Sequence, residues 1–179
     1  MAGPAVDTYL YLMDEAFQGP GLEESHESQA LLNNLESVTE AQWQAKVPGV
    51  ERTIAWMVIH LGTCKVMYDD YAFGSGKLFW DMPEVQPWPE DQAPMAATLA
   101  WLRECQARLR SHVAVLTDDQ LDEPRLTNWG EMKPTRWIIA AMIGHDFYHA
   151  GEINHLRSLL DGDDRWAYVR EIEDAATPG

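Results

Sequence analysis

Two histidines, His145 and His149, stand one helical turn apart in a stretch that predicts a buried helix face. On a helix of about 100° per residue, Ile138 and Leu156 each fall about 20° from His145, and His149 falls about 40° from it. Both imidazoles therefore lie in the middle of the apolar stripe. Two neutral imidazoles on one face can present their nitrogens to the same metal ion.

A third histidine, His60, has the same placement on a separate helical stretch. With His60 at zero, Trp56 falls near −40° and Tyr71 near 20°, so this imidazole also points toward the core. A single histidine on an apolar face is more often a satisfied core residue than a ligand. Three of them on two buried faces favour a metal centre with an open coordination position, because packing of the two helices can bring them to one point. We therefore predict one divalent metal ion at His60, His145 and His149.

Two further residues near these histidines carry side chains that can take part in catalysis or bind a metal ion. Glu152 falls about −20° from His145, one turn beyond His149, and we expect it to act as a catalytic base or to orient an imidazole. Cys64 follows His60 by one turn and is within reach of the ion, although a small buried cysteine is the commoner outcome. Imidazole ligands suit several ions, so zinc or nickel is expected first, with iron and manganese as alternatives.

The elements that must position these residues are helical by periodicity. Apolar residues recur at helical spacing over residues 6–17, 22–38, 53–73, 95–116 and 134–160. The polar or proline-containing stretches 39–50, 77–94 and 117–133 are expected to be connections, and no alternating run is long enough to predict a strand. The predicted fold is all-α: a helix bundle of four long helices with an extra N-terminal helix. We expect a single domain over residues 1–179, with a core at about 6–160 and a polar tail at 163–179.

The long connection at residues 77–94 contains four prolines and two tryptophans, Trp80 and Trp88. Long loops in compact domains are often functional lids, and aromatic side chains commonly line ligand pockets. We therefore expect this loop to roof the metal site, the alternative being that it only covers the end of the bundle.

Composition excludes several classes of partner. The chain has 179 residues, with 13 Lys plus Arg against 29 Asp plus Glu and a net charge of −16. This acidic balance argues against nucleic acid and against anionic membrane surfaces, both of which are bound through basic residues. No apolar run approaches the roughly 18 residues of a membrane-spanning helix, and the first residues do not form a secretory signal. Two cysteines, Cys64 and Cys105, are expected to be free thiols in the cytoplasm.

Three segments of the chain resemble the DinB/YfiT-like superfamily of metal-dependent four-helix-bundle proteins. The segment 53–61 resembles the family's helix that ends in a histidine ligand, and 145–153 resembles its H-x3-H signature followed by x-G-Q-I. Gly19-Pro20 followed by His26 is similar to an element of some relatives, but Ser25 stands where a Trp often precedes the histidine. The likeness covers about residues 6–160. One departure is Glu152, where many relatives have Gln.

The resemblance implies an up-down-down-up bundle, a metal triad at His60, His145 and His149, and a homodimer. It also implies activity as an S-transferase for a low-molecular-weight thiol, with a small-molecule thiol and an electrophile as substrates. A metal ion binds the thiol and stabilises the thiolate, so no protein nucleophile is needed.

Two other functions remain open. In a metal-dependent hydrolase, bound water would be activated with Glu152 or Asp146 as base. In a non-catalytic stress or interaction protein, the metal would only tie two helices together.

Overall fold

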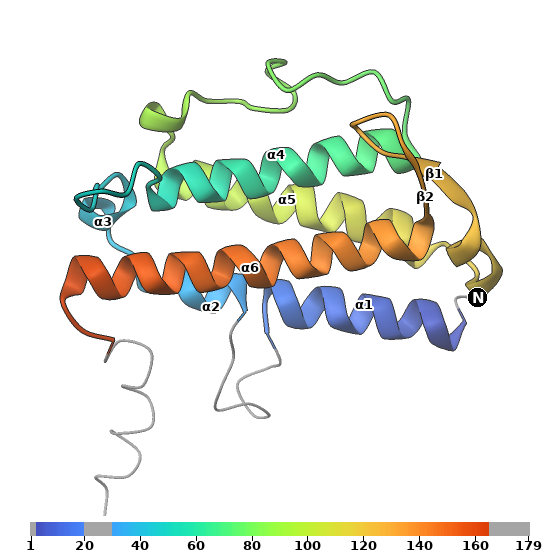
Figure 1. The fold of residues 1–179 in the computed structure, drawn as a ribbon, viewed down its shortest axis with the longest axis horizontal. Helices are drawn as coiled ribbons and strands as arrows, with labels where there is room; N and C mark the ends of the chain where they lie inside the picture. The colour runs from blue at the N-terminus through green and yellow to red at the C-terminus, as the bar shows by residue number, and fades with distance from the viewer. Residues whose placement is uncertain (1–2, 20–29, 165–179) are drawn as a thin grey trace, which may run out of the picture.

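The computed structural model describes residues 3–19 and 30–164, and it confirms a mostly helical fold (Figure 1). In chain order the elements are α1 Pro4–Phe17, α2 Leu31–Leu35, α3 Glu40–Trp43, α4 Ile54–Phe73, a 3-10 turn Glu90–Gln92, α5 Met95–Ala114, a second 3-10 turn Asp118–Asp122, β1 Pro124–Leu126, β2 Met132–Pro134 and α6 Thr135–Asp161. None of the described helices is both long and apolar enough to cross a membrane.

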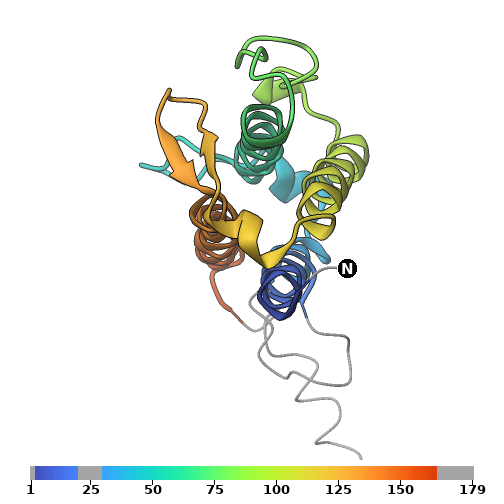
Figure 2. The ribbon, with the colours of Figure 1, turned by 90° about the vertical axis from the view of Figure 1, so that its right-hand side faces the viewer.

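Four long helices, α1, α4, α5 and α6, lie side by side along most of their length. Each contacts two of the others: α4 lies beside α5 and α6, and α1 also lies beside α5 and α6 (Figure 2). In Figure 1, α1 and α6 run in one direction, while α4 and α5 run in the other. This arrangement places the middle of α6 against α4, where the predicted metal ligands lie.

Local signals set the ends of the helices that carry these ligands. Helix α4 begins after Thr53, whose hydroxyl accepts a hydrogen bond from the Trp56 N–H at 3.1 Å, as an N-cap residue does. It ends at Gly74, whose N–H donates to the Asp70 carbonyl at 2.9 Å. Helix α6 ends at Gly162, which has φ of +74°, a left-handed conformation that glycine adopts without strain.

Of the helix expected over residues 22–38, the structure describes residues 30–38, and only Leu31–Leu35 of these is helical. This short helix packs on α6, where the Arg157 guanidinium donates to the Asn34 carbonyl at 2.7 Å. A new helix begins at once, because Thr39 and Gln42 form a capping box for α3. The long N-terminal helix α1 is therefore one of the four long helices rather than an addition to them.

The expectation that residues 77–94 roof the metal site is not supported. The loop runs along α4 on the side away from α6, as Figures 1 and 2 show. Val85 is fully buried against residues of α4 and α5, and its carbonyl accepts a hydrogen bond from Thr63 at 3.2 Å. Trp88 packs against Trp101 of α5 with ring centroids 6.1 Å apart, and Trp80 remains 45 % exposed.

The connection at residues 117–133 contains a small antiparallel hairpin that the sequence did not predict. Strands β1 and β2 pair through Arg125 opposite Lys133, and the turn between them includes Gly130 at φ of +89°. Each strand has only three residues, too few for an alternating pattern to be recognised.

We predict that the fold survives metal removal. Three clusters of buried apolar side chains fill the interior without using the predicted ligands, so the core does not need a metal to form, unlike that of a zinc finger. A chelator should leave the helical circular dichroism intact at room temperature and lower the melting temperature. A metal held at about 100 times its Kd adds about 2.7 kcal/mol, or roughly 5–10 °C for a chain of this size. Complete unfolding by the chelator would contradict the prediction.

Candidate metal centre

The three predicted ligands lie close together at the contact between α4 and α6. The Nε2 atom of His145 is 3.2 Å from Nε2 of His60 and 3.1 Å from Nε2 of His149. His149 is buried, and the other two are partly buried. The helical spacing of His145 and His149 and the packing of α4 on α6 are sufficient to bring the imidazoles together.

The spacing of these nitrogen atoms fits a shared metal ion. Ligand nitrogens at about 2.0–2.1 Å from a tetrahedral zinc ion are roughly 3.3 Å from one another. Cys64 also belongs to this cluster: the ligand atoms of His60, Cys64 and His145 all lie within 4.8 Å of one another. Its Sγ atom is 3.7 Å from Nε2 of His60. The donor set present is therefore suited to a divalent transition metal.

Burial keeps the three imidazoles neutral. It lowers the pKa of His60, His145 and His149, and for His145 the pKa falls to about 3. The neighbouring imidazoles lower the pKa of His145 further, because a second positive charge beside a first is unfavourable. At neutral pH these side chains keep the lone pairs that a metal ion requires.

Glu152 lies on the far side of His149 from the cluster. Its Oε2 atom is 2.6 Å from Nδ1 of His149, while Oε1 is 3.0 Å from the Arg52 guanidinium. The Tyr148 hydroxyl lies 3.4 Å from the same Oε1. A carboxylate at Nδ1 favours the tautomer with the proton on Nδ1 and leaves Nε2 free to bind metal. The geometry therefore places Glu152 as a positioning residue for His149.

A stack of planar groups holds the third imidazole. Trp56 stacks on His60 with ring centroids 5.0 Å apart and planes 12° apart. Arg52 lies on Trp56, 5.4 Å from the ring centroid, and also pairs with Glu152. The same arginine therefore contacts groups that orient His60 and His149.

A buried ion pair that was not predicted from the sequence lies beside these ligands. The Lys65 ammonium lies 2.7 Å from both carboxylate oxygens of Asp146, and the two side chains are 1 % and 3 % exposed. A signal for it exists: Lys65 is the only Lys, Arg, Asp or Glu between Ile54 and Met67, and Asp146 the only one between Trp137 and Gly151. Lys65 and Asp146 have opposite charges and stand in two stretches that contain no other charged residue. Because a charged side chain is rarely buried unless it is paired, this pattern predicts that the two residues form an ion pair.

This pair changes what Asp146 can do. Both of its oxygens face Lys65, and burial raises its pKa while the ammonium lowers it. The carboxylate is buried and both of its oxygens are paired with Lys65, so the role of hydrolytic base considered for Asp146 is not supported.

Neither cysteine is a reactive thiolate in the metal-free protein. Burial raises the pKa of Cys64 to about 12 and that of Cys105 to about 12. A thiol with such a pKa is protonated at neutral pH and is a poor nucleophile.

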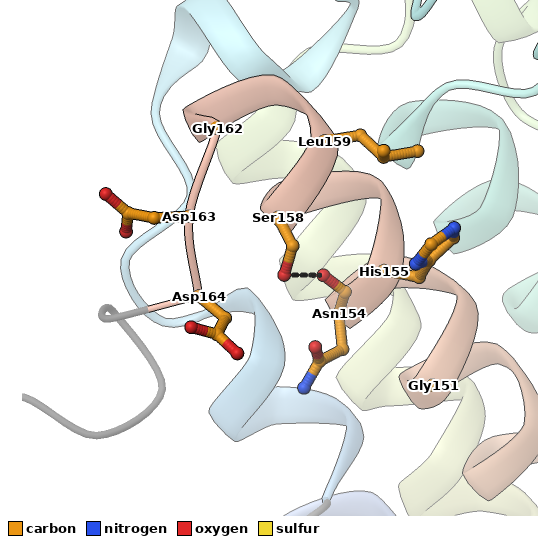
Figure 3. A pocket seen from close by; sticks show the side chains of 8 residues that line it. All are labelled: Gly151, Asn154, His155, Ser158, Leu159, Gly162, Asp163 and Asp164. Atoms are coloured by element: carbon orange, nitrogen blue, oxygen red, sulfur yellow. Dashed lines mark hydrogen bonds between the residues drawn. The ribbon is translucent and has the colours of Figure 1, made fainter.

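The remaining histidines lie apart from the cluster or outside the described residues. Nδ1 of His112 is 2.6 Å from the Asp69 carboxylate between α5 and α4. His26 lies in the part of the chain that the structure leaves undescribed. His155 lines a shallow depression of about 570 Å³ at the C-terminal end of α6 (Figure 3). None of the three predicted ligands lines this depression.

We predict that breaking the Lys65–Asp146 pair from one side destabilises the protein strongly. Lys65→Met or Asp146→Leu alone leaves a buried charge unpaired, which costs about 3–5 kcal/mol. The double variant should recover most of that loss. Urea denaturation of the four proteins measures it. Glu131→Gln is the control, because its pair with Lys133 is exposed and contributes less than about 1 kcal/mol. Equal losses in the single and double variants would contradict the prediction.

We also predict that Glu152 raises metal affinity through His149. Glu152→Ala removes the group that fixes the tautomer, and loss of such a partner costs roughly 10–100-fold in metal affinity. Competition with a chromogenic chelator measures the affinity. Glu104→Ala, an exposed glutamate on α5, is the matched control. An unchanged affinity in Glu152→Ala would show that the carboxylate does not act on the ligand.

Comparison with known proteins identifies the family to which the chain belongs. The model of the DinB superfamily matches residues 24–153, which include His60, Cys64, His145, His149 and Glu152. No curated protein matches the chain. Since the match spans well over half of the sequence, the chain belongs to the DinB superfamily.

Proposed function

We propose that this protein binds one divalent metal ion through His60, His145 and His149 and uses it as an S-transferase for a low-molecular-weight thiol. The observation that carries the proposal is that three neutral imidazoles converge. The Nε2 atom of His145 lies 3.2 Å from Nε2 of His60 and 3.1 Å from Nε2 of His149. Apolar side chains would fill this part of the core better, because buried polar groups cost free energy unless they are paired. Core packing alone therefore does not explain three imidazoles here.

A divalent ion in this cluster supplies positive charge that stabilises a bound thiolate at neutral pH. Side chains around the site fix the tautomer, the orientation and the charge of the three imidazoles. Glu152 fixes the tautomer of His149, Trp56 and Arg52 fix the plane of His60, and burial keeps all three rings neutral. The protein offers no ionised cysteine of its own before the metal binds, so the nucleophile is expected to come from the substrate.

Neither carboxylate that we considered as the base of a hydrolase is free. Asp146 is locked to Lys65, and Glu152 is held between Arg52 and the Nδ1 atom of His149. A general base must reach the proton that it removes. We therefore favour transfer chemistry over hydrolysis.

The same proposal covers the arrangement of the helices, the identity of the metal, the cellular compartment and the oligomeric state. We propose that α1, α4, α5 and α6 constitute the up-down-down-up bundle, that zinc or nickel is the ion, and that the protein acts in the cytoplasm as a homodimer. The outward face of α6 supports the dimer, because it exposes Trp137, Phe147, Tyr148 and Leu159, each more than 40 %. Exposed apolar side chains in such number commonly mark an interface.

The test is turnover of small thiols by the metal-loaded protein. The full chain, loaded with zinc or nickel, is incubated with a panel of low-molecular-weight thiols and a chromogenic electrophile. Thiol consumption should require metal and should fall by at least about 100-fold in His149→Ala, since ligand loss removes the ion. His155→Ala is the matched control, because His155 is an exposed histidine on the same helix. No metal-dependent rate with any thiol, together with cleavage of a chromogenic ester, would overturn the proposal in favour of a hydrolase.

A further inference from the structure

We infer that Tyr68, Trp129 and Trp137 form the subsite that binds the apolar, aromatic group of the electrophilic substrate. These three side chains are called the aromatic cluster below. The inference rests on the proposed function, because it gives the second substrate of the transfer a place near the metal centre. It also gives a role to the hairpin of β1 and β2, which has no other part in the proposed reaction.

The aromatic cluster joins three separate elements at one point. Trp129 lies in the turn of the hairpin, Tyr68 on α4 and Trp137 in the first turn of α6. The ring centroid of Trp129 is 5.7 Å from that of Tyr68 and 5.9 Å from that of Trp137, and both pairs meet edge to face. The hairpin contacts both helices, over α6 and beside α4 (Figure 2). Trp129 therefore bridges the two helices that carry the predicted metal ligands.

The aromatic cluster and the metal centre lie along the same contact between α4 and α6. Tyr68 follows His60 by eight residues on α4. Trp137 precedes His145 by eight residues on α6. Since the two helices run in opposite directions (Figure 1), both steps lead the same way along the contact. Eight residues of helix rise about 12 Å, so the cluster stands about two turns from the imidazoles.

Small side chains lie between the aromatic cluster and the metal centre. Midway along this step stand Cys64 on α4 and Ala141 on α6, each four residues from the histidine of its helix. Residues four apart on a helix lie one above the other, so these two positions are on the path from the imidazoles to the cluster. Neither side chain is bulky. A ligand that reaches from the metal centre to the cluster is therefore not blocked at these positions.

The aromatic cluster is exposed and adds no net charge. Trp129 is 46 % exposed and Trp137 is 42 % exposed, although each contacts another ring. Grouped apolar side chains on a surface often mark a binding site, and aromatic rings commonly line one. The Lys133 ammonium lies 5.5 Å from the ring centroid of Trp137, but it is paired with Glu131 at 2.9 Å. The cluster therefore favours a neutral, apolar group.

Hydrogen bonds hold the hairpin on the helices before any ligand binds. The Arg125 guanidinium donates to the Ala72 carbonyl at 3.1 Å and to the Thr135 hydroxyl at 2.9 Å. In the turn, the N–H and the hydroxyl of Thr127 each donate to the Glu131 carbonyl at 2.8 Å. A preformed surface binds a ligand without the cost of ordering its own loops.

The aromatic cluster would orient the electrophile for the transfer. In that step the thiolate sulfur forms a bond to the electrophilic carbon, and the leaving group departs with the electron pair of the bond that breaks. The proton of the thiol goes to solvent. With the thiol at the metal centre and an aromatic ring on the cluster, the reacting carbon is held between them. We therefore expect aromatic electrophiles to be better substrates than small electrophiles without a ring.

Binding of a neutral apolar fluorophore tests the aromatic cluster without any reaction. N-phenyl-1-naphthylamine, whose emission rises in apolar surroundings, is titrated into the full chain and its variants. Trp129→Ala should weaken binding about threefold to tenfold, as expected for one lost aromatic contact, and Trp129→Phe should retain most of the affinity. Trp80→Ala is the matched control and should bind as wild type does, because Trp80 is 45 % exposed and lies in the 77–94 loop, away from α6.

Kinetics connect the aromatic cluster with the metal centre. Zinc-loaded protein is given the thiol of the panel that reacts fastest, and 4-nitrobenzyl bromide is compared with iodoacetamide, which has no ring. Trp129→Ala should raise KM for 4-nitrobenzyl bromide about threefold to tenfold. It should leave KM for iodoacetamide and the zinc affinity unchanged. N-phenyl-1-naphthylamine should compete with the aromatic electrophile only.

The outcomes separate this inference from the proposed function. Unchanged probe binding and KM in Trp129→Ala would overturn the inference even if the melting temperature falls, because the cluster would then only fasten the hairpin. Loss of probe binding together with a change of oligomeric state in sedimentation would assign the cluster to an interface between copies and would also overturn it. Absence of thiol turnover in the wild type would overturn the proposed function, while probe binding would still decide whether the cluster takes an apolar ligand. If Trp129→Ala does not fold, the same comparison with Trp137→Ala decides.

Discussion

The Lys65–Asp146 ion pair is the constraint on which the geometry of the candidate metal centre depends. It joins α4 to α6 inside the protein, where a misplaced charge would cost several kcal/mol. Lys65 adjoins Cys64, and Asp146 adjoins His145. Any sliding or rotation of one helix against the other that separates the imidazoles also pulls the ammonium away from the carboxylate. Apolar contacts tolerate such shifts far better, because the hydrophobic effect has no preferred direction.

The charges around the cluster balance pairwise before any ion binds. Asp146 is neutralised by Lys65, Glu152 by Arg52, and the three imidazoles carry no charge because burial lowers the pKa of each. Each carboxylate near the centre therefore already has a cation. Unpaired carboxylates beside the site would offset the charge of a bound ion, so this pairing would leave that charge available for the thiol chemistry that we propose.

The sequence alone was sufficient for part of this picture, and the reason differs for each part. The positions of His60, His145 and His149 follow from helical periodicity, which the long helices α4 and α6 obey over many turns. The end predicted at residue 38 was too late, since α2 stops at Leu35, because periodicity does not show where a short helix packed on α6 must end. The hairpin of β1 and β2 was missed because three-residue strands carry no recognisable pattern. The course of the 77–94 loop depends on Val85 reaching a site between α4 and α5, which is a tertiary contact that no local signal reveals.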